Sequence, residues 1–197
     1  MTLNGIDVSN VNGPIDWNAY RGKIQFAGVK ITEGCWFADQ LAAQNIAGAR
    51  SIGAAVIGYH FLHANTPGTK QAEYFLSHAK ASGLVRGDHI AIDAEDGGRD
   101  GLDVQHLVAA SEEFAAELRL HFPGYHPELY TEISLAPSFT KLGNCPLWLA
   151  NPSRVHTGPL GPWPGPSIEQ VGQRGVDTDV FYGTVAELAK LAIPHAN

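Results

Sequence analysis

The stretch AAVIGYHFLHANTPGTKQAEYFLSHAKASGLVRGDHIAIDA, residues 54–94, contains two apolar segments separated by a helical pattern. Residues 54–61 and 89–94 are short and almost continuously apolar, which is typical of strands buried on both faces. Between them, Thr66 and Pro67 provide a hydroxyl N-cap and a proline at the first helical position, and Gly83 can end a helix that runs to residue 82. This order predicts a parallel sheet covered by helices.

The same alternation continues along the rest of the chain. Further strands are predicted at residues 3–8, 25–31, 128–131, 146–150, 167–171 and 176–181. Further helices are predicted at residues 38–51, 103–122 and 185–191, the second of them capped by Asp103. Seven or eight strands in one sheet favour a β/α barrel, although 197 residues are few for a fold of typically ~250. We therefore predict one α/β catalytic domain over residues 1–197, an irregular TIM-type β/α barrel with helices lost in its second half.

Composition and charge exclude several classes of protein. The chain is 44% hydrophobic and 17% charged, which indicates a globular protein rather than a disordered one. Its net charge of −7 and its lack of basic runs argue against nucleic acid or an anionic membrane as a partner. Residues 1–4 lack the features of a signal peptide, so we expect synthesis in the cytoplasm. Cys35 and Cys145 are expected to be reduced thiols rather than a bridge.

Side chains suited to chemistry gather where the predicted strands end. In a β/α barrel these positions converge on one face, which carries the active site. The strand ends carry Asp7, Glu33, Tyr59, His60, Asp93, Glu95, Tyr130, Trp148 and Asp177. A single aspartate after a strand more often caps the next turn, so the prediction depends on several acids converging. Even together, they indicate only a hydrolase or lyase acting on a polar substrate.

Asp93 and Glu95 are the most informative pair. Two residues apart on one predicted strand, they point to the same face with Cα atoms ~6.5–7 Å apart. Two such close carboxylates do not both ionise freely, so one keeps a proton beside an anion. Glycoside hydrolysis needs this pairing, because an acid protonates the leaving oxygen and a carboxylate supports the oxocarbenium-like centre. Tyr130 and Trp148 add surfaces on which sugar rings can stack.

Other chemistries fit less well. His60 and His63 are three residues apart, but no metal-ligand motif accompanies them, so we predict no metal and interpret His60 as a buried histidine bonded to neighbouring strands. The chain has no nucleophile elbow, phosphate-binding loop or dinucleotide fingerprint. Neither cysteine has a local reason for a lowered pKa.

At this point the sequence resembles glycoside hydrolase family 25, the Chalaropsis-type lysozymes of bacteria and phages. The matching segments follow in order along nearly the whole chain. They are GIDVS (5–9), IDW (15–17), VKITEG (29–34), GYHF (58–61), IDAE (92–95), LYT (129–131), LWLA (147–150) and VDTDVFYG (176–183). The D-x-E pattern alone is weak, whereas the ordered set is specific.

The resemblance implies an N-acetylmuramidase that cuts the β-1,4 bond from N-acetylmuramic acid to N-acetylglucosamine in peptidoglycan. By position, Glu95 is the general acid, and Asp93 either holds the substrate acetamido group or stabilises the developing charge. Asp7 and Asp177 match two further acids of the groove, and Tyr59 matches a substrate contact. One account of the family makes an aspartate the nucleophile. The other makes the reaction substrate-assisted, with retention of configuration.

Further expectations follow from the resemblance. We expect a monomer without cofactor, a phage endolysin that acts on the bacterial wall after release from the cytoplasm. Glu33 is a candidate substrate contact, although an ion pair with Lys30 is the stronger interpretation, and Asp179 is expected to support the final turn. Residues 168–171 replace an aromatic motif of the family, and residues 158–166 form a local elaboration. A chitinase-like glucosaminidase and a non-catalytic glycan-binding barrel remain the alternatives.

Overall fold

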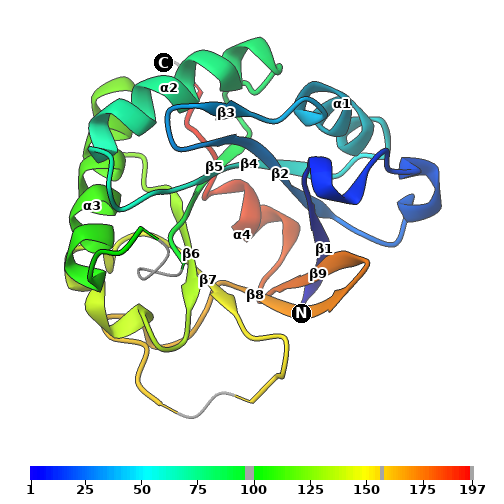
Figure 1. Cartoon of the computed structure of the whole chain (residues 1–197). Coiled ribbons are helices and arrows are strands. Elements are labelled where there is room, and N and C mark those ends of the chain that lie inside the picture. The colour runs from blue at the N-terminus through cyan, green and yellow to red at the C-terminus, as the bar shows by residue number, and fades with distance from the viewer. Residues whose placement is uncertain (96–99, 156–157, 196–197) are drawn as a thin grey trace.

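The chain forms a closed barrel with few helices, as the computed structural model of residues 1–95, 100–155 and 158–195 shows (Figure 1). The sheet follows the order β1-β9-β8-β7-β6-β5-β4-β2-β3, and a further pairing of β1 with β2 closes eight of the strands into the barrel. The strands are β1 (Leu3–Val8), β2 (Phe26–Glu33), β3 (Phe37–Ala38), β4 (Ala55–Phe61), β5 (His89–Asp93), β6 (Glu128–Glu132), β7 (Leu147–Ala150), β8 (Ile168–Arg174) and β9 (Val176–Phe181). The predicted irregular β/α barrel is confirmed.

Helices cover the first half of the barrel far more than the second. They are α1 (Ala42–Ser51), α2 (Gly68–Ala81), α3 (Val104–His121) and the short α4 (Val185–Ala189). Between β6 and α4 the described residues form no α-helix, only two short 3₁₀ turns. The predicted loss of helices in the second half is therefore confirmed, and it explains how 197 residues suffice for the barrel.

Three local expectations were wrong. The sheet is not wholly parallel, because β9 runs antiparallel to both β1 and β8. The helix expected at residues 38–51 begins only at Ala42, since Phe37 and Ala38 pair with the end of β2 instead. Thr66 does not cap α2, and the backbone N–H of Gly68 donates instead to Glu113 of α3, at 2.8 Å.

The interior of the barrel changes from apolar to polar toward the carboxyl ends of the strands. Phe26, Ile57 and Ala91 are fully buried and belong to one apolar cluster inside the barrel. Two residues further along the same strands stand Gly28, Tyr59 and Asp93. Alternate residues of a strand share a face, so Gly28, Tyr59 and Asp93 also face the inside of the barrel. They lie closer to its mouth than the three apolar residues do. The fold therefore prepares one end of the barrel for polar groups.

Two further structural features bear on the sequence expectations. Cys35 and Cys145 are both free, as predicted. Among the described residues, no helix is both long and apolar enough to cross a membrane.

Candidate active site

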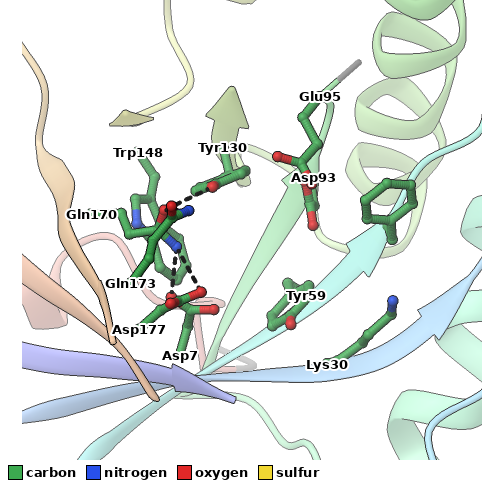
Figure 2. Close-up of a pocket in the computed structure, with 11 residues that line it drawn as sticks. Asp7, Lys30, Tyr59, Asp93, Glu95, Tyr130, Trp148, Gln170, Gln173 and Asp177 are labelled. Carbon is green, nitrogen blue, oxygen red and sulfur yellow. Dashed lines mark hydrogen bonds between the residues drawn. The ribbon is translucent and has the colours of Figure 1, made fainter. Parts of the chain in front are cut away.

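A pocket of about 220 Å³ opens at the carboxyl-terminal mouth of the barrel (Figure 2). It is built from inward-facing side chains of β1, β2, β4, β5, β6, β7, β8 and β9 together with the residues that follow β5. Its lining residues are Asp7, Lys30, Tyr59, Phe61, Asp93, Glu95, Tyr130, Trp148, Gln170, Gln173 and Asp177. Seven of the eight predicted site residues thus line one pocket, and only Glu33 does not.

One wall of the pocket carries two carboxyls on neighbouring antiparallel strands. Asp7 of β1 lies directly opposite Asp177 of β9. Gln170 of β8 donates from its amide nitrogen to Oδ2 of Asp7 at 3.1 Å and to Oδ2 of Asp177 at 3.3 Å (Figure 2). Its Oε1 in turn accepts from the Tyr130 hydroxyl at 3.1 Å and from Gln173 Nε2 at 3.2 Å. Gln170 therefore holds the two carboxyls at fixed positions.

This wall favours protonated carboxyls. Burial, followed by the charge of Asp177, raises the pKa of Asp7 from 3.8 to about 7. Burial also raises the pKa of Asp177. The Gln170 amide opposes the shift at Asp7, because a donor stabilises the ionised form. Asp7 is consequently poised to gain or lose a proton near neutral pH.

Asp93 and Glu95 form the opposite side of the pocket (Figure 2). Asp93 ends β5 and is 8% exposed, and its buried Oδ1 meets no hydrogen-bond donor among the described residues. Burial, and then the charge of Glu95, raises the pKa of Asp93 well above its usual value, although the Lys30 ammonium opposes this. Of the two carboxyls, Asp93 is the more buried one, so burial favours its protonated form in the free protein.

Glu33 belongs to an ion-pair network beside the pocket. Its Oε2 lies 2.6 Å from Lys30 Nζ, and its Oε1 lies 3.1 Å from His63 Nε2. On the other side of the ring, His63 Nδ1 lies 2.8 Å from Asp100 Oδ1. The predicted pair of Lys30 and Glu33 is thus present, and it holds the Lys30 ammonium at the edge of the pocket. Glu33 therefore positions the Lys30 ammonium through this ion pair. Its role as a substrate contact stays a prediction.

Tyr130 and Trp148 line the pocket, whereas His60 is buried in the core. Tyr130 and Trp148 pack edge to face, with ring centroids 5.6 Å apart, and together form an aromatic side of the pocket. His60 is fully buried, with Nδ1 at 2.8 Å from Thr32 Oγ1 and Nε2 at 3.1 Å from Gln71 Oε1. His60 is therefore buried as predicted, but only Thr32 lies on a neighbouring strand, because Gln71 belongs to α2.

Four lining residues were not predicted to be site residues: Lys30, Phe61, Gln170 and Gln173. Gln170 was near the end of a predicted strand, so the same rule that selected the acids could have selected it. Gln173 lies on an extension of β8 beyond the predicted end at residue 171. Phe61 follows Tyr59 by two residues on the same predicted strand, so strand alternation could have placed it on the same face. Lys30 lies within a matching segment but was interpreted only as the partner of Glu33.

The acidic pocket also makes a prediction for stability. The carboxyls whose pKa is raised are Asp7, Asp93, Asp177 and Asp179. For each, the stabilising effect is fully present below the unfolded pKa of 3.8 and is lost as the pH rises through the folded pKa, which is about 7 for Asp7. His60 opposes them, because burial lowers its pKa to about 3 and the unfolded chain then binds its proton more readily.

We expect the melting temperature to fall between pH 5 and pH 8, because four such carboxyls outweigh one histidine. Below ~pH 4 stability is expected to fall again, since Glu33 and Asp100 have lowered pKa values and lose their ion pairs on protonation. Calorimetry in steps of half a pH unit measures this profile. A melting temperature that rises steadily from pH 5 to pH 8 contradicts it.

The acids of the described residues are not grouped as metal ligands. Among the described ranges, no group of three or more His, Cys, Asp or Glu side chains is placed to hold a metal ion. The pocket contains several carboxyl groups beside aromatic side chains. Burial raises the pKa values of the aspartates among them and so favours their protonated forms. A pair of carboxyl groups in different protonation states is the equipment of a glycoside hydrolase.

The comparisons with known proteins agree with this class. The family model of the glycosyl hydrolases family 25 matches residues 6–164, and the chain belongs to this family. The N,O-diacetylmuramidase of Arthroderma benhamiae is 27% identical over 207 residues, which cover 97% of this chain and 87% of that protein. The resemblance found in the sequence is thereby confirmed.

Solved structures lead to the same family. A family GH25 lysozyme from Aspergillus fumigatus superposes with a TM-score of 0.84 at 28% identity, covering 98% of this chain and 99% of that one. The bacterial lysozyme from Streptomyces coelicolor gives a TM-score of 0.82 at 26% identity and covers 96% of each chain. The chain is therefore similar over almost its full length to lysozymes of both a fungus and a bacterium.

Proposed function

We propose that this chain is an N-acetylmuramidase that hydrolyses the β-1,4 bond between N-acetylmuramic acid and N-acetylglucosamine in peptidoglycan. The observation that carries the proposal is the meeting of Asp93 and Glu95 with Asp7 and Asp177 around one pocket. Family membership and the lysozyme and muramidase names of the similar proteins support the substrate.

Glu95 is the general acid in this proposal. It is half-buried and lines the pocket just beyond the end of β5, where the chain leaves the strand. From there its carboxyl group protonates the glycosidic oxygen as the bond to the departing sugar breaks. The charges of Glu95 and Asp93 oppose each other's ionisation, so the pair retains a proton for this step.

Asp93 binds the acetamido group of the muramic acid ring. The acetamido N–H donates to the Asp93 carboxylate, which orients the acetamido oxygen toward the anomeric carbon. That oxygen attacks as the leaving group departs, and water later opens the ring that forms, so the configuration is retained. Asp93 lines the pocket and is 8% exposed, so its carboxyl group can be reached by a donor of the substrate.

Substrate binding also determines which carboxyl of the pair holds the proton. In the free protein, burial and the neighbouring charge favour protonated Asp93. A donor from the acetamido group favours the ionised form of Asp93, because hydrogen bonding to a charged form stabilises it. The pair then keeps its proton on Glu95, where the leaving oxygen needs it.

The other lining residues bind the sugar. Asp7 and Asp177 present acceptor oxygens fixed by Gln170, and these suit sugar hydroxyls. Tyr59 lies between this wall and Asp93 (Figure 2), and Tyr130 and Trp148 offer aromatic surface. We propose that the enzyme acts as a monomer on the bacterial wall, as an endolysin made in the cytoplasm and released at lysis.

Analysis of the new reducing ends tests the function. Purified peptidoglycan is digested, reduced with borohydride and hydrolysed, and the amino sugar alcohols are quantified. A muramidase yields muramitol as the new product. Glucosaminitol as the main product indicates the chitinase-like alternative, and the absence of both indicates a barrel that binds glycan without cutting it. Either of these results contradicts the proposal.

A further inference from the structure

Behind the pocket wall lies a buried carboxyl that the mechanism does not use. Asp179 of β9 is 1% exposed and does not line the pocket. Its Oδ1 accepts a hydrogen bond from the indole Nε1 of Trp148 at 2.9 Å. Its Oδ2 is shielded from solvent and meets no N–H or hydroxyl donor in the described part of the chain. These contacts point toward the pocket, whereas the sequence had suggested that Asp179 supports the final turn.

The remaining partner of Asp179 is another carboxyl. The side chains of Asp179 and Asp7 are neighbours, close enough for each to act on the pKa of the other. The strands place them diagonally, since Asp7 faces Asp177 in the register of β1 and β9 and Asp179 lies two residues further along the same face. Two carboxyl groups bond only if one of them carries a proton, because two carboxylates offer acceptors alone.

The surroundings indicate which of the two is the donor. Asp7 receives the Gln170 amide and lines the pocket, whereas Asp179 is enclosed. Burial, and then the charge of Asp7, raises the pKa of Asp179 well above its usual value. Asp179, the more enclosed of the two carboxyls, is therefore the better site for the proton.

We propose that Asp179 is a positioning residue, a buried neutral acid that accepts from Trp148 and donates its proton to Asp7. This proposal rests on the proposed function, because it gives Asp7 an oriented carboxylate to present to the sugar. One side chain thereby fixes two features of the pocket, the acid of β1 and the aromatic ring of β7.

Gly28 shows how closely the two features are packed. A Cβ atom at this position of β2 would lie 2.6 Å from Cη2 of Trp148 and 2.8 Å from Cβ of Asp7. Contacts of this length do not occur, so the indole and the Asp7 side chain both pack directly on the glycine backbone. Gly28 therefore restricts where both side chains can lie, and Asp179 bonds to the indole of Trp148.

Other ionisable groups around the pair belong to several strands. Asp177 lies on β9, Asp93 ends β5, and Glu95 follows it. Tyr59 of β4 and Tyr130 of β6 line the same pocket, and Lys30 of β2 is its cation among the described residues. The charges of Asp177 and Glu95 therefore act on the titration of Asp7, whereas a neutral Asp179 adds no charge of its own.

Two substitutions of Asp179 test whether it acts as a neutral hydrogen-bonding group or through a negative charge. In Asp179→Asn the amide oxygen can still accept from Trp148 and the amide nitrogen can donate to Asp7, as the protonated acid does. In Asp179→Leu both bonds are lost at similar volume. We expect kcat of the asparagine variant to stay within about threefold of wild type with an unchanged pH profile, and kcat of the leucine variant to fall at least about tenfold. Asp16→Asn, at an exposed site, controls for the loss of one formal charge.

Carbon-13 NMR of labelled aspartate carboxyls gives a readout that needs neither activity nor substrate. We expect Asp179 to stay protonated through pH 7. We expect Asp7 to titrate close to its wild-type pKa in Asp179→Asn, but about one pH unit higher in Asp179→Leu, where its donor is gone. An ionised Asp179 at pH 7, or an asparagine variant as impaired as the leucine variant, overturns the proposal. So does full activity of both variants. If wild type proves inactive on peptidoglycan, the proposed function fails, and the NMR result still decides the state of Asp179.

Discussion

Replacing Glu95 with glutamine should lower the rate of peptidoglycan hydrolysis by at least about 100-fold, and by up to about 10,000-fold, with the fold intact. A general acid contributes roughly 10²–10⁴-fold in rate, and an amide cannot give a proton to the leaving oxygen. The substitution keeps the volume of the side chain and removes only the ionisable group from a half-buried position in the pocket. Clearing of a suspension of bacterial walls, followed by turbidity, measures the effect.

The matched control is Glu73→Gln, on the exposed face of α2. It makes the same chemical change at a residue that does not line the pocket and should leave the rate within about twofold of wild type. Circular dichroism spectra of both variants should match that of wild type. Equal clearing by wild type and Glu95→Gln removes Glu95 from the role of acid.

Replacing Asp93 with asparagine should have opposite effects on activity and stability. We expect kcat to fall about 100-fold or more, because an amide offers the substrate acetamido group no charged acceptor. At pH 7.5 we expect the melting temperature to rise by about 3–6 °C, since ~1 kcal/mol corresponds to about 2–4 °C in a chain of this size. The reason for the gain is that the amide of Asp93→Asn cannot ionise, whereas the buried site opposes ionisation of the native carboxyl.

The pH dependence of this gain separates it from ordinary repacking. At pH 4.5 the carboxyl of Asp93 is protonated in the folded protein, so the stabilisation by asparagine should shrink to near zero. Calorimetry at both values measures the difference, with Asp16→Asn as the control for an exposed aspartate. An Asp93→Asn variant that is active, or one that is less stable at pH 7.5 than at pH 4.5 relative to wild type, contradicts the account.

The barrel could be predicted from the sequence because its strands are apolar on both faces and its long helices carry clear ends. Asp103 caps α3 as predicted, through hydrogen bonds from the backbone N–H groups of Gln105 and His106. The direction of β9 could not be predicted, since nothing in a short strand records which neighbour it pairs with. The hairpin of β2 and β3 was missed for a similar reason, because two residues carry no periodicity.

The site could be predicted to the level of which strand ends meet, but not to the level of protonation. Asp7 and Asp93 were found because barrel geometry brings the carboxyl ends of parallel strands together. Asp177 is the second residue of β9 and reaches the mouth only because β9 runs antiparallel, so for this residue the family resemblance was the valid signal. Asp93 is more buried than Glu95 because β5 ends at Asp93 and Glu95 lies outside the strand. The sequence does not show where the strand ends. The hydrogen bonds of Gln170 and the proximity of Asp179 to Asp7 depend on side-chain positions that no spacing encodes.

The central claim is that the glycosidic bond is cut where the four acids meet. A crystal structure of the Glu95→Gln variant with a peptidoglycan tetrasaccharide tests it most directly. We expect the glycosidic oxygen within hydrogen-bonding distance of the side chain at position 95, and the acetamido nitrogen of the muramic acid ring within that distance of Asp93. A glycan bound outside this pocket, or a glycosidic oxygen next to a different carboxyl, contradicts the claim.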